Sequence, residues 1–126
     1  MKHITQDDAH VFVTEEQIQD EIDGMIDFVR FLYDRFGVVA RGELSTRPEH
    51  RLGTDEQWDR AEGALQAALD RHGMEHVVSP GEGVFYGPKI DFDVADSIGR
   101  TWQLGTIQLD YNAPERFDLK YVGDDN

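Results

Sequence analysis

Three short segments of the sequence carry side chains suited to binding a small polar ligand. The first is the run Phe85-Tyr86-Gly87-Pro88-Lys89-Ile90-Asp91-Phe92, which sets a phenol and an ammonium group beside a Gly-Pro bend. The apolar and acidic residues after the bend alternate, and this pattern is typical of a strand. Because a bend that leads directly into a strand holds its side chains rigidly, we expect Tyr86 and Lys89 to line a binding site.

The second segment lies near the start of the chain, where Gln6, Asp8 and His10 alternate with other residues. In a strand these three side chains share one face, because successive residues point to opposite sides. An amide, a carboxylate and an imidazole on one face would suit a small polar ligand or a metal ion. A solvated strand face is the commoner explanation of such a pattern. One imidazole and one carboxylate do not complete a zinc site, which needs three or four protein ligands.

The third segment is the run Trp102-Gln103-Leu104-Gly105-Thr106-Ile107-Gln108-Leu109-Asp110. In an ideal strand Thr106 and Gln108 share one face, and Gln103 points the other way. A β-bulge near Gly105 would bring both glutamines to the same site. The alternative is an ordinary amphipathic strand that carries two surface amides.

The elements that must position these segments follow from capping and periodicity. Capping-box patterns begin at Thr14 and Thr54, and each precedes a helical stripe of apolar residues. We expect Phe28 and Trp58 to belong to the buried stripes. Helices are predicted from 14 to 37 and from 54 to 73, and strands over 5–13, 38–45, 75–78, 89–94 and 100–110. The order predicts an α+β fold, an antiparallel sheet with flanking helices that pack on one of its faces.

Composition limits the classes of protein that this chain can represent. With 126 residues it supports one domain, 1–126, in which we expect 119–126 to be a frayed tail. The net charge of −14 disfavours independent binding to nucleic acid or anionic lipid. There are no cysteines, and no apolar run approaches the roughly 20 residues of a membrane helix. We therefore expect a cytoplasmic protein with no membrane partner.

Five blocks in this order resemble the catalytic domain of the threonyl-tRNA synthetases, which are class II aminoacyl-tRNA synthetases. The resemblance runs from Ile4 to Asn126, so it covers nearly the whole chain. It implies part of the class II antiparallel sheet with its flanking helices. The blocks are Thr5-Gln6-Asp7-Asp8-Ala9-His10, Leu44-Ser45-Thr46-Arg47-Pro48-Glu49, Trp58-Asp59-Arg60-Ala61-Glu62, Phe85-Tyr86-Gly87-Pro88-Lys89-Ile90 and Gln103-Leu104-Gly105-Thr106-Ile107-Gln108-Leu109-Asp110.

The resemblance also implies a role for individual residues. It implies that His10 is a zinc ligand and that Asp8 accepts the hydroxyl proton of threonine. The positions that it assigns to the threonine pocket are Gln6, Asp8, Tyr86 and Gln108. Those that it assigns to the nucleotide or adenylate are Gln103, Thr106 and Lys89. The cofactors that it implies for the full-length family are Zn²⁺ and ATP with Mg²⁺, and the partners are threonine, ATP and, in the full-length context, tRNA.

The sequence also departs from the family pattern. Lys2 stands where the family has an arginine, and the preceding family arginine would fall before Met1. The cysteine and the second histidine that complete the family's zinc site are absent. So are the ATP-binding arginine of the third class II motif and the anticodon-binding domain. We therefore expect no catalytic set to be complete, the chain to be inactive alone, and zinc not to be bound tightly by His10 by itself.

Three hypotheses remain open. The chain is a fragment or homologue of a threonine–tRNA ligase, or a stand-alone paralogue that binds threonine or adenylate without catalysis, or a structural and interaction domain. An exposed sheet edge and apolar surface would favour self-association in each case, so we expect a homo-oligomer, in particular a dimer through that edge.

Overall fold

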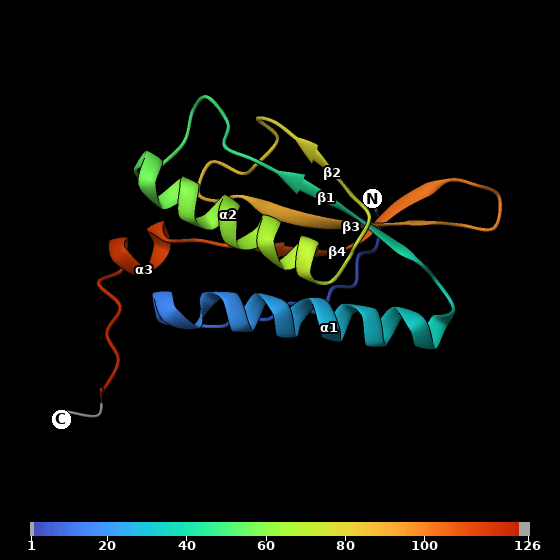
Figure 1. Ribbon diagram of the computed structural model, residues 1–126, viewed down its shortest axis with the longest axis horizontal. Coiled ribbons are helices and arrows are strands. Elements are labelled where there is room, and N and C mark those ends of the chain that lie inside the picture. Colours follow the sequence, from blue (N-terminus) through green and yellow to red (C-terminus); the bar gives the residue numbers. More distant parts are fainter. Residues whose placement is uncertain (1, 124–126) are drawn as a thin grey trace.

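A four-stranded sheet with helices on one face makes up most of the chain that the computed structural model describes, residues 2–123 (Figure 1). The strand order is β2-β1-β3-β4. Strand β3 pairs antiparallel with both β1 and β4, whereas β1 and β2 run parallel. The α+β prediction is confirmed, and the sheet is mixed rather than wholly antiparallel. The strands are β1 (Ala40–Ser45), β2 (His76–Ser79), β3 (Lys89–Ala95) and β4 (Thr101–Gln108).

Both capping-box patterns mark the start of a helix. A short 3-10 turn, η1 (Glu15–Gln17), leads into α1 (Ile18–Phe36), and α2 spans Asp55–Arg71. At α2 the Thr54 hydroxyl accepts from the backbone N–H of Gln57 at 3.2 Å, and the Gln57 side chain accepts from the backbone N–H of Thr54 at 2.9 Å. Helix α1 ends at Gly37, whose φ of 66° is the left-handed conformation that favours glycine. A third helix, α3 (Asn112–Arg116), was not predicted.

The core lies between the sheet and the two long helices, which run side by side across the same face (Figure 1). Phe92 and Ile90 of β3 meet the buried faces of α1 and α2 there and are fully buried. The prediction that Phe28 belongs to the core is wrong, because its side chain is 64% exposed. Phe28 follows the buried Ile26 by two residues, about 200° around a helix, so it faces away from the sheet.

The strand predicted for residues 5–13 is not formed. The described part of this segment has no regular secondary structure, and residues 2–12 are exposed. A strand needs a neighbour for its backbone hydrogen bonds, and no pairing in the described chain includes this segment. Of the predicted tail 119–126, residues 119–123 also lack regular structure, and 124–126 lie outside the described residues.

The hairpin between β3 and β4 is closed by one carboxylate. Asp96 accepts hydrogen bonds from Trp102 Nε1 at 3.0 Å, from the backbone N–H of Arg100 at 2.9 Å and from the backbone N–H of Ile98 at 3.0 Å. These bonds, with the Trp102 indole as the largest cause, lower the pKa of Asp96 to about 2. The turn is therefore tied at both ends by a group that stays ionised at all ordinary pH values.

None of the helices among residues 2–123 is both long enough and apolar enough to span a membrane.

Candidate functional site

The sheet face opposite the helices carries the polar residues that the sequence singled out. On β3 the side chains of Lys89 and Asp91 point to this face, because their neighbours Ile90 and Phe92 point into the core. The described chain places no helix over this side of the sheet, as the ribbon shows (Figure 1). On this face Lys89 is partly exposed, whereas Asp91 is buried.

A β-bulge in β4 brings both glutamines to this open face. The register pairs Gln108 with Lys89 and Thr106 with Asp91, and then shifts so that Gln103 pairs with Asp93. Cross-strand partners share a face, so the shift places Gln103, Thr106 and Gln108 on one side. The bulge predicted near Gly105 is confirmed, and it places both glutamines on the same face.

Gly105 allows the bulged strand to lie close to helix α1. A Cβ atom at this position would lie 2.8 Å from the hydroxyl oxygen of Tyr33 and 3.5 Å from Cδ2 of Phe92. The Tyr33 ring is almost wholly buried, and burial raises the pKa of its hydroxyl. Glycine is therefore required by close packing at this point rather than by an unusual backbone conformation.

Asp91 is the centre of a hydrogen-bond cluster on the open face. One carboxylate oxygen, Oδ2, pairs with Lys89 Nζ at 2.7 Å. The other, Oδ1, accepts from Gln103 Nε2 and from Thr106 Oγ1, each at 2.8 Å. Gln103 Nε2 also donates to Thr106 Oγ1 at 2.8 Å, which closes a triangle of three side chains. The structure thus brings together the three residues that the resemblance assigns to the nucleotide.

Sequence reasoning missed Asp91 as a functional residue. It is 6% exposed, which is unusual for a carboxylate without a role in pairing or binding. The signal was present in the strand pattern, since Asp91 follows Lys89 by two residues and so shares its face.

Tyr86 lies at the end of the same face and contacts Gln108. Its hydroxyl donates to Gln108 Oε1 at 2.6 Å, so two of the four residues expected in the threonine pocket are in contact. This bond uses the glutamine oxygen and leaves its Nε2 free to donate, while the phenol oxygen can still accept. The pair therefore offers one donor and one acceptor to a ligand.

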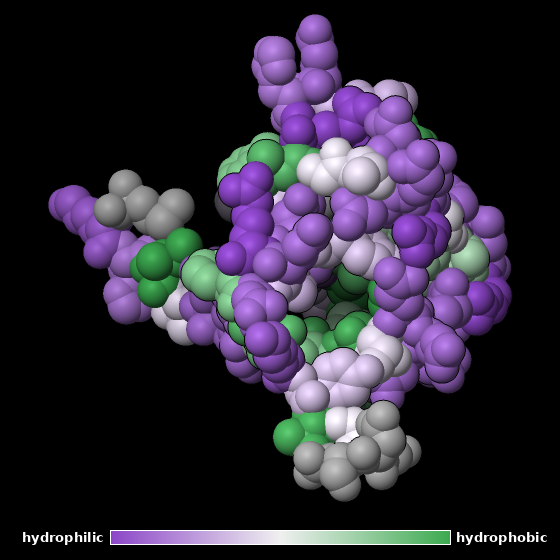
Figure 2. Space-filling model, turned by 90° about the vertical axis from the view of Figure 1, so that its left-hand side faces the viewer, coloured by the Kyte–Doolittle hydropathy of each residue, from purple (hydrophilic) through white to green (hydrophobic). Residues whose placement is uncertain are grey.

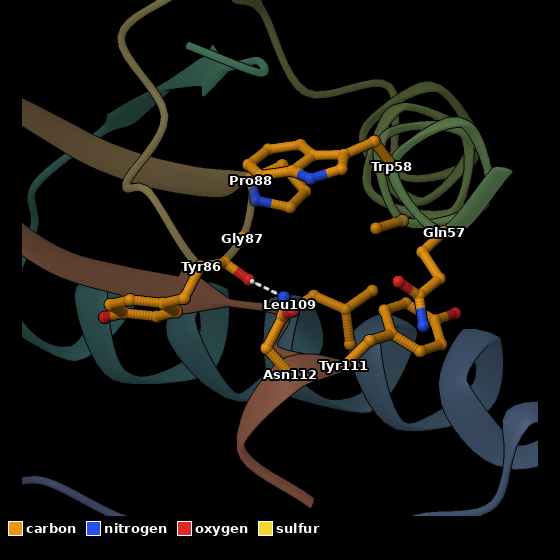
Figure 3. Close-up of a pocket in the computed structure, with 9 residues that line it drawn as sticks. Gln57, Trp58, Tyr86, Gly87, Pro88, Leu109, Tyr111 and Asn112 are labelled. Atoms are coloured by element: carbon orange, nitrogen blue, oxygen red, sulfur yellow. Dashed lines mark hydrogen bonds between the residues drawn. The ribbon is translucent and has the colours of Figure 1, made fainter. Parts of the chain in front are cut away.

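The bend that carries Tyr86 is fixed by contacts with Asn112 and Leu109. Asn112 Nδ2 donates to the Tyr86 carbonyl at 2.9 Å, as the close-up shows (Figure 3). At Gly87 a Cβ atom would lie only 2.0 Å from the carbonyl oxygen of Leu109, so no other residue fits without moving backbone. Tyr86 and Gly87 line a small pocket whose opposite side is formed by Trp58 of α2. Trp58 is itself fixed, because its Nε1 donates to the Leu52 carbonyl at 2.7 Å.

The molecule is hollowed at the end where α2 begins. In the space-filling view, polar residues surround a hollow whose floor is hydrophobic (Figure 2). At this end Val11 and Val13 of the N-terminal segment line a cavity with residues of α1 and β4, among them Met25 and Ile107. The N-terminal segment thus passes beside the end of β4 although it does not pair with it.

The structure does not bring the N-terminal candidates to the open face. Gln6, Asp8 and His10 are all exposed and make no hydrogen bond to residues 2–123. Within those residues no group of three or more His, Cys, Asp or Glu side chains is placed to hold a metal ion. The residues present therefore do not make up a zinc site, and the roles of these three side chains stay predictions.

Two of the sequence blocks proved to be joined by a structural ion pair. Arg47 donates from Nη2 to Glu62 Oε2 at 2.6 Å, and its backbone N–H donates to Glu62 Oε1 at 2.7 Å. Arg47 also pairs with Asp59, and the hydrogen bonds that its guanidinium donates to Glu62 and Asp59 raise the pKa of Arg47. This cluster fixes the end of β1 to α2, away from the Asp91 cluster.

The chain is similar in sequence to known threonine–tRNA ligases. The chain is 58% identical over 126 residues to the threonine–tRNA ligase of Myxococcus xanthus, a match that covers 100% of this chain and 20% of that protein. It is 59% identical over 121 residues to the threonine–tRNA ligase of Desulfatibacillum aliphaticivorans, covering 96% of this chain and 19% of the relative. The chain thus spans about a fifth of the length of these curated relatives.

Solved structures give the same result. The RNA-binding domain of threonyl-tRNA synthetase from Cryptosporidium parvum superposes with a TM-score of 0.80 at 49% identity, covering 86% of this chain and 27% of that one. A threonyl-tRNA synthetase from Aeropyrum pernix gives a TM-score of 0.75 at 31% identity, covering 84% and 27%. The family model described as the tRNA synthetase class II core domain (G, H, P, S and T) matches residues 1–126. The chain therefore belongs to the class II tRNA synthetase core-domain family, and the relatives described above are threonyl-tRNA synthetases.

Proposed function

We propose that this chain forms one wall of the site at which a threonine–tRNA ligase activates threonine with ATP, for protein biosynthesis in the cytoplasm. The observation that carries the proposal is the bulged strand β4, which gathers Gln103, Thr106 and Gln108 on the open face beside Lys89. The similarity to threonine–tRNA ligases over the whole chain supports the choice of substrate. Because the chain spans about 20% of that relative, the activity is proposed for the longer enzyme.

In this proposal Tyr86 and Gln108 contact threonine, together with Gln6 and Asp8 of the N-terminal segment. Threonine and valine have nearly the same shape, so a pocket that relies on shape alone separates them poorly. A site that must hydrogen-bond the hydroxyl group rejects the analogue without it by about 10⁴ or more. The donor and acceptor that Tyr86 and Gln108 offer are suited to that demand.

Gln103, Thr106 and Lys89 contact the nucleotide or adenylate in the same proposal. Lys89 uses Nζ to pair with Asp91 and has further protons with which to bind a phosphate oxygen. Its positive charge counters the repulsion that a chain of net charge −14 exerts on an anionic ligand. His10 is proposed as one zinc ligand, and further ligands from the longer enzyme would be needed to bind the metal ion.

A chimeric enzyme tests the proposal. The matching block of the Myxococcus xanthus ligase is replaced by this chain, and threonine-dependent ATP–pyrophosphate exchange is measured. We expect the chimera to catalyse exchange and the chain alone to catalyse none. In the chimera, Gln108→Leu should lower the exchange rate by at least about tenfold. A soluble chimera without exchange would refute the proposal, and robust exchange by the isolated chain would refute its assignment to the longer enzyme.

Calorimetry with the isolated chain separates the other two hypotheses. Saturable binding of threonine or of a non-hydrolysable threonyl-adenylate analogue, with little binding of the valyl analogue, is expected for a ligand-binding wall. Absence of any saturable binding would favour a structural and interaction domain.

Sedimentation tests the predicted self-association. We expect a dimer through a sheet edge at high protein concentration, and a monomer at that concentration would contradict the prediction.

A further inference from the structure

We propose that Asp91 is a positioning residue that fixes the Gln103 amide so that the Gln103 carbonyl oxygen, and not its NH₂ group, faces the ligand. The inference deepens the proposed function, because it rests on Gln103 being part of the nucleotide wall. It adds a residue to which neither the sequence patterns nor the family resemblance assigned a role.

The orientation follows from the chemistry of the carboxylate. An ionised carboxylate has only acceptors, so the amide group that lies 2.8 Å from Asp91 Oδ1 must be the NH₂ end of Gln103. The second amide proton has its own acceptor, the Thr106 hydroxyl oxygen at 2.8 Å. Thr106 in turn donates its single hydroxyl proton to Asp91 Oδ1 at 2.8 Å, so its direction is fixed as well. Every donor of the triangle is used inside the triangle.

The unused group is then the carbonyl oxygen of Gln103. The Gln103 side chain is exposed on the open face, so this oxygen can accept a hydrogen bond from a ligand. On the other side of the same carboxylate, the Lys89 ammonium group has donors to spare. Asp91 thus places an acceptor and a cationic donor next to each other, an arrangement that suits a hydroxyl group beside an anionic oxygen, as in a ribose phosphate.

The burial of Asp91 makes this arrangement stiff. The residue is 6% exposed, whereas Gln103 and Thr106 are exposed. A buried carboxylate that lost these donors would pay the cost of desolvation without compensation. The exposed amide is therefore held by a buried anchor, and it does not reorient freely as a surface glutamine would.

The test uses NMR spectra of the Gln103 side-chain amide in this chain without ligand, in wild type and in Asp91→Asn. Asp93→Asn is the matched control, since Asp93 lies two residues further along the same face and has no side-chain hydrogen bond or ion pair to residues 2–123. We expect the two Gln103 Nε2 protons to exchange slowly with solvent in wild type and Asp93→Asn. In Asp91→Asn they should exchange at least about tenfold faster. Unchanged exchange in folded Asp91→Asn would overturn the inference.

A second variant covers the case in which Asp91→Asn does not fold. Thr106→Val keeps the shape of the side chain and removes the hydroxyl, so one of the two Gln103 Nε2 protons should lose its acceptor. Thr106→Ser, which keeps the hydroxyl, should leave both protons protected. Equal exchange in these two variants would overturn the triangle and with it the role of Asp91.

Titration with adenosine, which is uncharged, tests the ligand side. Removal of a negative charge near an anionic ligand favours binding by itself, so a neutral probe isolates the effect of orientation. We expect Asp91→Asn to weaken adenosine binding about tenfold and Asp93→Asn to leave it unchanged. Equal affinity in both variants would overturn the claim that the orientation serves the ligand. If wild type binds no adenosine, the proposed nucleotide wall is wrong, and so is the claim that the orientation of Gln103 serves the ligand. The proton-exchange experiment still decides whether Asp91 fixes the amide.

Discussion

Replacing Gly105 by alanine measures how tightly the bulge of β4 is packed against helix α1. The added Cβ would lie 2.8 Å from the Tyr33 hydroxyl oxygen, closer than van der Waals contact allows, and the next atom, Phe92 Cδ2, lies at 3.5 Å. Tyr33 is only 9% exposed, so its ring has little room to move. Overpacking of this kind costs about 1–3 kcal/mol. We therefore expect Gly105→Ala to lower the free energy of unfolding by about that amount.

The same change should be nearly harmless when the obstructing oxygen is removed. With Tyr33→Phe the nearest remaining atoms are Phe92 Cδ2 at 3.5 Å and the Cζ atom of residue 33 at 4.0 Å, which are ordinary contacts. Gly105 does not have a positive φ, so alanine fits its backbone and stiffens the unfolded chain, a gain of about 0.4–1 kcal/mol. The coupling energy between the two substitutions should then be about 1–3 kcal/mol.

Urea denaturation of the four proteins of this cycle provides the measurement. Fluorescence of Trp58, which is 2% exposed in the folded state, follows the loss of the core. Tyr33→Phe alone should be close to neutral, because the hydroxyl donates no hydrogen bond to the residues that the structure describes. Equal destabilisation by Gly105→Ala in both backgrounds, with unchanged denaturant dependence, would refute the reasoning.

Three further substitutions or titrations follow from the packing and charges described above. Gly87→Ala should abolish the cooperative thermal transition, because its Cβ would lie 2.0 Å from a backbone carbonyl oxygen. Gly63→Ala is the control, since its Cβ would have no atom within 4 Å, and it should stabilise α2 by about 1 kcal/mol. Similar thermal melting of the two variants would contradict this reasoning. Glu62→Ala should cost about 1.5–3 kcal/mol in urea unfolding, because it removes the hydrogen bonds that Glu62 accepts from the guanidinium and from the backbone N–H of Arg47. Glu56→Ala on the same helix should cost little, so equal losses would count against the pair. The pKa of Asp96 is lowered from 3.8 to about 2, so its carboxylate should stabilise the hairpin above pH 4 and lose that effect as the pH falls through about 2. A titration midpoint near 3.8 for the Asp96 carboxyl carbon in NMR spectra would contradict this.

Local sequence signals predicted the helices and the bulge because their causes are local. The capping box at Thr54 and the glycine at position 37 fix helix ends through bonds within a few residues. Gly105 indicated the bulge because a glycine within an apolar strand marks either a bulge or a close approach, and here it marks both.

The features that the sequence did not reveal depend on contacts between distant segments. Alternation of apolar and polar residues is the same in parallel and antiparallel strands, so the parallel pairing of β1 with β2 left no local trace. The polar strand expected at Gln6, Asp8 and His10 has a suitable pattern but no neighbour among the described strands. The strand pattern places Asp91 beside Lys89, but its bonds with Gln103 and Thr106 form only through pairing across the sheet.

The bulge also determines which changes of length the chain can tolerate. Strand β4 contains one residue more than its partner between the pairs Phe92–Gly105 and Asp93–Gln103. Deletion of Leu104 would restore plain alternation and still leave Gln103 opposite Asp93 on the polar face, because Leu104 is the extra residue. A residue added in the turn between the two strands would leave both pairings intact. A one-residue insertion at the tip of this hairpin and the deletion of Leu104 should therefore both be accepted, because each keeps Gln103 on the polar face.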